Sequence, residues 1–119
     1  MIEQLSAVTL ATGDMGRAVR FYQALGVQLL HGAENADFAS FRIGPCYLNL
    51  ALRPGYKPGA PWGRVIFYVS DVDQLYNRAL AQGLQPSTRP RDAEWQERYF
   101  HISDPDGHEL SFARPLASR

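Results

Sequence analysis

The sequence predicts an α+β fold made of two βαβββ modules in tandem. Apolar residues first alternate as in a strand, and after Asp14 they recur with the spacing of an amphipathic helix. Residues 54–63 then break all periodicity, because three prolines and three glycines fall within ten positions. The same order starts again beyond that segment. An offset of 57 places Asp14 on Asp71 and Gly26 on Gly83, which indicates a structural repeat.

Two helices are expected at equivalent places in the repeat. Asp14 and Asp71 are suited to N-cap the helices, since a carboxylate can accept from the unpaired amides of a first turn. Gln74 follows Asp71 by three residues, as in a capping box. Gly26 and Gly83 suit the left-handed position that ends a helix. The predicted buried faces are Met15, Ala18, Tyr22 and Leu25 in the first helix, and Val72, Leu75, Tyr76, Ala79 and Leu80 in the second.

Strands account for the remaining periodic segments. They are expected at 5–12, 27–31, 36–43 and 46–53 in the first module, and at 64–69, 86–90, 96–103 and 108–114 in the second. Module 1 would span about residues 4–54 and module 2 about residues 63–115. A module of about 55 residues has only a marginal core, so we expect the two to pair as one domain over residues 1–119.

Composition excludes several classes of protein. Twelve basic residues balance twelve acidic ones, and Lys57 is the only lysine, so the chain lacks the positive footprint of a nucleic-acid binder. Cys46 is the only cysteine, which rules out an internal disulfide. No apolar run approaches the ~20 residues that span a bilayer, and no signal peptide is recognisable. We therefore expect a cytoplasmic protein without nucleic-acid or membrane partners.

The second half ends in the most recognisable segment, Asp-Pro-Asp-Gly-His-Glu-Leu-Ser-Phe at 104–112, a tight turn that leads into a strand. Together with Asp-Met-Gly-Arg-Ala-Val-Arg-Phe-Tyr-Gln-Ala-Leu-Gly at 14–26 and the duplicated βαβββ order, it resembles the vicinal oxygen chelate superfamily of glyoxalases, bleomycin-resistance proteins and extradiol dioxygenases. The resemblance covers nearly the whole chain. It implies open, curled mixed sheets (half-barrels) with the helices on their outer face, a ligand pocket between the modules, and a homodimer. It does not specify an activity, because the fold hosts many.

The same resemblance implies that no metal is bound. The positions where metal-dependent relatives carry ligands fall on Ala7, Asn49, Arg64 and Ser111. None of these is a strong ligand for a transition metal. A guanidinium ~4 Å from a divalent ion would oppose it by about 8 kcal/mol at an effective dielectric of 20. We therefore expect no cofactor. A relocated site remains an alternative, and it would use His101, Glu97, Glu109 and His108.

Strand alternation indicates which side chains face the pocket. The ligand-binding candidates are Arg64, Arg42, Asn49, Tyr47, Tyr68, Tyr99, Ser111 and Trp62. The two arginines would favour an anionic group and the tyrosines would stack on a flat ring. Structural readings stay open beside these roles: Arg64 can pair with Glu109 across neighbouring strands, Asn49 can satisfy backbone groups, and the tyrosines can pack in the core or in a dimer.

His101 and Glu97 are the weak candidates for a catalytic acid or base. The leading prediction is a metal-free glyoxalase/bleomycin-resistance-like protein that binds a small anionic or aromatic molecule. One alternative is an enzyme of the same superfamily, either a metal-dependent lyase, isomerase or dioxygenase with relocated ligands, or a metal-free lyase using His101 or Glu97. Another alternative is a protein that sequesters an antibiotic. The sequence does not name the ligand or decide whether the protein is catalytic.

Overall fold

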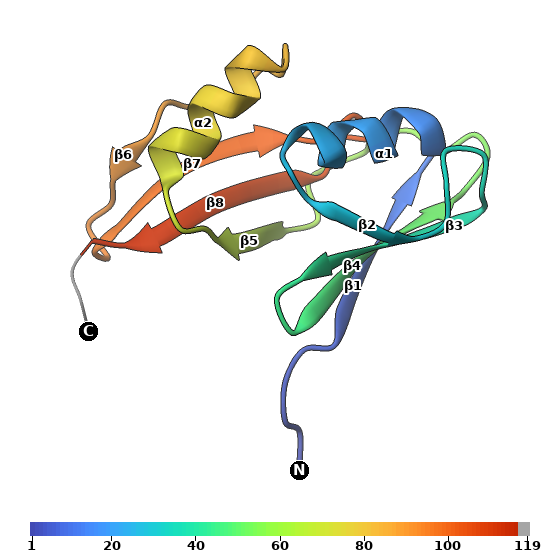
Figure 1. Cartoon of the computed structure of the whole chain (residues 1–119), viewed down its shortest axis with the longest axis horizontal. Coiled ribbons are helices and arrows are strands. Elements are labelled where there is room, and N and C mark those ends of the chain that lie inside the picture. The colour runs from blue at the N-terminus through green and yellow to red at the C-terminus, as the bar shows by residue number, and fades with distance from the viewer. Residues whose placement is uncertain (117–119) are drawn as a thin grey trace. The chain divides into compact units, whose positions relative to one another are not determined.

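The structure, a computed structural model, describes residues 1–116 and forms two compact units. The first unit spans Met1–Pro58 and the second begins at Gly59. The boundary falls inside the segment 54–63 that the sequence marks as a connector. Each unit contains one helix and four strands, in the order β-α-β-β-β (Figure 1).

In the first unit, strand β1 (Ala7–Thr12) leads into helix α1 (Met15–Ala24), and three strands follow. These are β2 (Gln28–His31), β3 (Phe38–Ile43) and β4 (Cys46–Leu52). The sheet has the order β1-β4-β3-β2, with β1 parallel to β4 and the other pairs antiparallel. The helix thus serves as the crossover that a parallel pair requires.

The second unit repeats this topology. Strand β5 (Arg64–Tyr68), helix α2 (Val72–Ala81), β6 (Arg91–Asp92), β7 (Glu97–Ser103) and β8 (Glu109–Pro115) give the order β5-β8-β7-β6. Here β5 is parallel to β8, and the other pairs are antiparallel. Both sheets are mixed and open rather than closed on themselves (Figure 1). The predicted α+β fold with tandem βαβββ modules is therefore confirmed.

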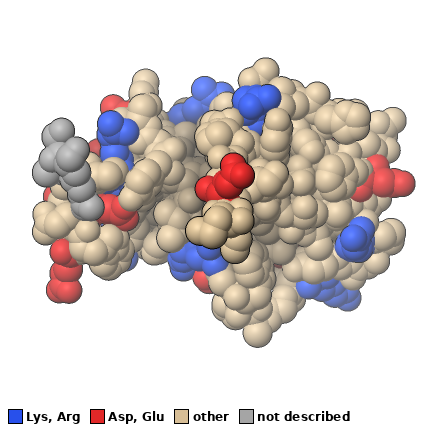
Figure 2. Space-filling model, turned by 90° about the horizontal axis from the view of Figure 1, so that it is seen from below, with Lys and Arg blue, Asp and Glu red and all other residues tan. Residues whose placement is uncertain are grey.

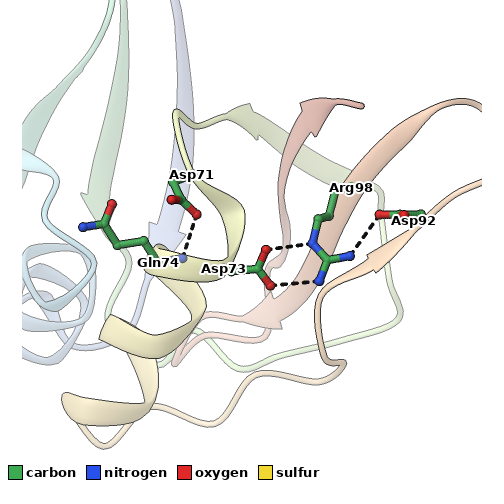
Figure 3. A network of polar contacts seen from close by, with 5 residues as sticks. All are labelled: Asp71, Asp73, Gln74, Asp92 and Arg98. Atoms are coloured by element: carbon green, nitrogen blue, oxygen red, sulfur yellow. Dashed lines mark hydrogen bonds and ion pairs between the residues drawn. The ribbon is translucent and has the colours of Figure 1, made fainter. Parts of the chain in front are cut away.

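The helix boundaries fall at the predicted residues. The Asp14 carboxylate accepts from the Arg17 amide at 3.0 Å, and the Asp71 carboxylate accepts from the Gln74 amide at 3.0 Å. The Gln74 side chain points away from Asp71 (Figure 3), so this cap is the one-sided form and not the reciprocal box. Gly26 and Gly83 adopt φ values of +88° and +80°, the left-handed conformation that glycine tolerates best.

The strand predicted at 86–90 is wrong. The structure instead has the two-residue strand β6 at Arg91–Asp92. Pro86 and Pro90 bracket the predicted segment, and a proline has no amide hydrogen to donate to a ladder. The segment still lies beside β7, because the Ser87 amide donates to the carbonyl of His101 at 2.8 Å.

Each unit has its core on the side of the sheet that faces its helix. Fully buried residues of the strands point to that side: Phe41, Leu48 and Leu50 in the first unit, and Phe100, Ile102 and Leu110 in the second. In the second unit an ion-pair cluster also joins the helix to the sheet. Arg98 on β7 donates to both oxygens of Asp73 on α2, at 2.8 and 2.9 Å, and to Asp92 on β6 at 2.9 Å (Figure 3).

Candidate functional site

The candidate site residues lie on the sheet faces opposite the helices, which we call the open faces. Because successive strand residues alternate between faces, the strand registers define each set. In unit 1 it comprises Ala7, Thr9, Phe38, Ser40, Arg42, Tyr47, Asn49 and Ala51. In unit 2 it comprises Arg64, Ile66, Tyr68, Glu97, Tyr99, His101, Glu109, Ser111 and Ala113. The strand candidates predicted from alternation therefore share one face within each sheet.

Arg64 is the centre of the polar contacts on the unit 2 open face. It lies opposite Glu109 in the parallel ladder and donates to that carboxylate from Nη2 at 3.1 Å. Its Nη1 donates to the Ser111 hydroxyl at 3.2 Å. The side chains of Arg64 and Glu109 are 31% and 35% exposed, so solvent screens this ion pair in part. The pairing of Arg64 with Glu109, left open by the sequence, is what the structure shows.

His101 extends this network to β7. Its Nδ1 lies 2.6 Å from the Ser111 hydroxyl oxygen. Burial lowers the pKa of His101 from its ordinary 6.5, and the positive charges of Arg64 and Arg91 lower the pKa further, against an opposing effect of Glu109. A neutral ring can accept a hydrogen bond at Nδ1 from the Ser111 hydroxyl, while the Ser111 oxygen accepts a hydrogen bond from Arg64. The network is thus satisfied with His101 uncharged near neutral pH.

Glu97 lies on the same face but contacts a different set of groups. Its two carboxylate oxygens accept from the Tyr68 hydroxyl and, at 3.1 Å, from the Trp95 indole nitrogen. Tyr99 is stacked on Trp95 with ring centroids 5.6 Å apart and lies 4.8 Å from the His101 ring. The Tyr99 hydroxyl accepts from Arg91 at 3.0 Å. Aromatic rings therefore form a row along β7.

The unit 1 open face carries a shallow depression of about 450 Å³. Its lining is Ser6, Ala7, Leu30, His31, Ser40, Tyr47 and Asn49. Asn49 accepts from Ser40 at 2.6 Å and donates to Thr9 at 3.2 Å, so both ends of its amide have side-chain partners. The alternative in which Asn49 serves the backbone is not what these contacts show. Arg42 lies over the Tyr47 ring at 5.2 Å and donates to the Gly44 carbonyl at 3.3 Å.

Trp62 stands apart from the other candidates. It is exposed, and its indole nitrogen donates to Nδ1 of His108, a buried residue of the turn before β8, at 3.0 Å. Among residues 59–116, no hydrogen bond or ring contact joins Trp62 to Arg64, Ser111 or His101. Its observed contact therefore anchors the end of the connector to the turn.

The four positions to which the resemblance assigns metal ligands offer little to a metal ion. Ala7 has no donor atom, and Asn49 and Ser111 offer neutral oxygens that already take part in hydrogen bonds. Arg64 contributes a cation. Within residues 1–116, no three histidine, cysteine or carboxylate side chains gather in an arrangement that could hold a metal, and this includes the alternative set of His101, Glu97, Glu109 and His108. The side chains at these positions therefore do not fit a transition-metal ion.

Leu30, His31 and Trp95 are not among the ligand-binding candidates drawn from the sequence. Leu30 and His31 line the unit 1 depression because the β2–β3 register shifts between Leu29 and His31, and simple alternation cannot anticipate such an irregularity. Trp95 precedes β7, so no strand pattern assigned it to a face, although its stacking on Tyr99 places it there. The signal that could have found it was its position two residues before Glu97, the side chain that it contacts.

A sequence profile of the Glyoxalase/Bleomycin resistance protein/Dioxygenase superfamily matches residues 4–112. The chain belongs to this superfamily. Its match to an uncharacterized protein of Mycobacterium tuberculosis is 40% identical over 48 residues, which is 40% of this chain and 28% of that protein. The chain thus matches less than a third of the length of that relative.

Solved structures of similar fold include a ligand complex. TioX from Micromonospora sp. ML1 is 27% identical, with a TM-score of 0.76 over 96% of this chain and 100% of its own. A bleomycin-binding protein complexed with bleomycin is 23% identical, with a TM-score of 0.75 over 95% of this chain and 98% of its own. The second likeness concerns the fold alone. Neither helix α1 nor helix α2 has the length and apolar character needed to cross a bilayer.

Proposed function

We propose that this superfamily member binds a small anionic or aromatic molecule on the unit 2 open face, without a metal ion. The observation that carries the proposal is the position of Arg64. Arg64 stands at a position to which the resemblance assigns a metal-coordinating side chain. Its guanidinium lies on the open face and is hydrogen-bonded to Ser111 and Glu109. A divalent ion beside this group would meet a fixed positive charge, which opposes its binding.

The contacts of Arg64 leave it able to bind a ligand. The Ser111 and Glu109 contacts use two of the five N–H groups that a guanidinium offers. Glu109 compensates part of the charge, so a ligand would be recognised through directed hydrogen bonds more than through long-range attraction. Figure 2 shows basic and acidic side chains interspersed on the face drawn, with no extended region of one sign. This supports local recognition of one acceptor group.

A second candidate function is a metal-free lyase, which the His101–Ser111 contact favours. A neutral imidazole 2.6 Å from a hydroxyl is a possible proton acceptor. Ser111 is only 4% exposed, so a substrate would have little access to that oxygen. Binding without chemistry is therefore the better supported function. The homodimer and the cytoplasmic location remain predictions from the resemblance and the composition, and sedimentation analysis tests the first.

Binding is tested with benzoate as the probe, by calorimetry and by thermal shift. A ligand at 100 times its Kd stabilises the folded state by about 2.7 kcal/mol, so even a weak ligand gives a measurable shift. We expect Arg64→Ala to weaken benzoate binding by about tenfold, the loss of one good charge-assisted hydrogen bond. Arg20→Ala, at an exposed arginine of α1, is the matched control and should bind as the wild type does. Equal affinity of Arg64→Ala and wild type would place Arg64 outside the site.

A further inference from the structure

Three large apolar side chains on the unit 2 open face are strongly exposed to solvent. Ile66 is 62% exposed, Tyr68 is 65% exposed and Trp95 is 62% exposed. Single exposed apolar residues are common, but a contiguous group with a polar rim marks a binding surface. Here Tyr68 and Trp95 converge on one carboxylate, and Ile66 lies two residues before Tyr68 on the same face of β5.

Glu97 holds these exposed rings in place through their polar edges. The Tyr68 hydroxyl donates to one carboxylate oxygen and the Trp95 indole nitrogen to the other. An exposed aromatic side chain normally keeps its rotamer freedom, and fixing it costs entropy. The hydrogen bonds engage the ring edges and leave most of each ring accessible. Two rings are thus ordered in advance of any contact with a ligand.

Trp95 receives further support from the backbone and from Tyr99. Gln96, between Trp95 and Glu97, has a φ of 69°, a left-handed conformation that costs energy for a residue other than glycine. Reversing the chain there brings the indole back over β7, where it stacks on Tyr99 with a 29° angle between the rings. The Tyr99 ring in turn lies 4.8 Å from His101, which contacts Ser111 beside Arg64.

We propose that Tyr68 and Trp95, both held by Glu97, form with Tyr99, on which Trp95 is stacked, an aromatic seat for a planar ring, and that the ligand of this face is an aromatic molecule with an oxygen acceptor at one end. The inference rests on the proposed function and specifies its ligand. The ring lies against the seat and the acceptor reaches toward Arg64. In this arrangement Glu97 is a positioning residue and not a base, since both of its oxygens accept hydrogen bonds from the rings that it orients.

The size of the exposed group favours a small molecule over a protein partner. Given that a large aromatic side chain buries 150–250 Å², the exposed parts of Ile66, Tyr68 and Trp95 amount to on the order of 400 Å². A stable protein interface needs about 800 Å² from each partner. A single or fused aromatic ring covers the seat without additional surface.

The test compares four probes that separate the ring from the charge: benzoate, cyclohexanecarboxylate, benzamide and cyclohexanecarboxamide. We expect each aromatic probe to bind about 3- to 10-fold more tightly than its saturated partner, as measured by calorimetry. Trp95→Leu and Glu97→Gln should bring that ratio close to one. Trp62→Leu, at an exposed tryptophan outside the seat, should leave the ratio unchanged. Circular dichroism and the melting temperature of each variant check that it folds.

The outcomes distinguish the two proposals. Equal binding of benzoate and cyclohexanecarboxylate, both weakened by Arg64→Ala, would overturn the seat and leave the proposed function intact. A ring preference that persists in the Arg64→Ala variant, together with an affinity for benzoate equal to that of the wild type, would support the seat and overturn the role given to Arg64 in the proposed function. Binding of no ring compound, or self-association that Trp95→Leu abolishes, would overturn the seat in favour of no ligand or of a second copy of the chain.

Discussion

The two open faces share one backbone plan and carry different chemistry. The ladder position occupied by Ala7 and Tyr47 in unit 1 is occupied by Arg64 and Glu109 in unit 2. Beside it, Ser40 pairs with Asn49 in unit 1, whereas His101 pairs with Ser111 in unit 2. Unit 1 thus presents a chain of neutral amide and hydroxyl groups at the same position where unit 2 presents an ion pair and an imidazole.

This difference shows which part of the repeat carries the fold and which part carries the chemistry. The helix-facing core is predominantly apolar in both units, and the capping aspartates and the glycines that end the helices recur at the offset of 57. Open-face residues have more freedom to differ, because they lie outside the helix-facing core and their exchange keeps the strand register that this core specifies. A duplicated module can therefore keep its architecture while one half acquires a binding surface.

The largest effect is expected where the two units agree. Phe41→Ala in unit 1 and Phe100→Ala in unit 2 each remove a fully buried ring from the helix-facing core. Each should lower the free energy of unfolding by about 3–5 kcal/mol, since the lost transfer free energy adds to the cavity left behind. Urea titration measures both losses. A loss below ~1 kcal/mol in one variant alone would show that its unit does not depend on that core.

A smaller effect is expected where the units differ. Ser111→Ala removes the acceptor of Arg64 and the partner of His101 at a buried position, and should cost about 1–2 kcal/mol. Asn49→Leu removes contacts to Ser40 and Thr9 at a more exposed position, and should cost no more than about 1 kcal/mol. Chemical denaturation of both variants checks the order. The reverse order would mean that the neutral hydrogen bonds of Asn49 stabilise the unit 1 sheet more than the charged network around Ser111 stabilises the unit 2 sheet.

The pH dependence of stability should depend on unit 2. Because burial and neighbouring charges lower the pKa of His101 in the folded state, the unfolded chain takes up a proton first as pH falls. His101 therefore contributes stability that is present above its ordinary pKa of 6.5 and is lost as pH falls from there through the folded pKa. Arg64→Gln should raise that pKa, as measured by NMR titration of the ring protons. Arg42→Gln, in unit 1, is the control that should leave it unchanged.

The smallest effects are expected at the surface ion pairs that join each helix to its surroundings. Within residues 1–116, Arg98 pairs with Asp73 and Asp92, whereas Arg20 pairs with one carboxylate, that of Glu34. Exposed pairs contribute about 0.2–1 kcal/mol each, so Arg98→Gln should cost slightly more than Arg20→Gln, and added salt should reduce both losses. The hydrogen bond from Arg98 lowers the pKa of Asp73, so this contribution should be present above the ordinary pKa of 3.8 and should fade as pH falls below it. If the loss of stability in these variants does not depend on salt concentration, the arginine side chains stabilise the fold by packing and not by ion pairing.

The sequence predicted the repeat, the caps and the open faces because each has a local signal. Asp14, Asp71 and the glycines that end the helices act within one turn of chain, and strand alternation assigns Arg64, Tyr99 and Ser111 to a face without tertiary information. The choice of partner has no such signal. Glu97, which the sequence offers as a catalytic candidate, contacts Tyr68 and Trp95, because the turn around Gln96 determines which groups it reaches.

Our central proposal is that this chain binds its ligand through Arg64 and neighbouring protein groups, without a metal ion. The most direct test is elemental analysis by mass spectrometry of the protein purified without chelators and then dialysed against Zn²⁺, Ni²⁺ or Mn²⁺. We predict far less than one equivalent of any of these ions, and no rise in melting temperature on their addition. A full equivalent of bound metal that is lost in the Ser111→Ala or Asn49→Leu variant would contradict the account.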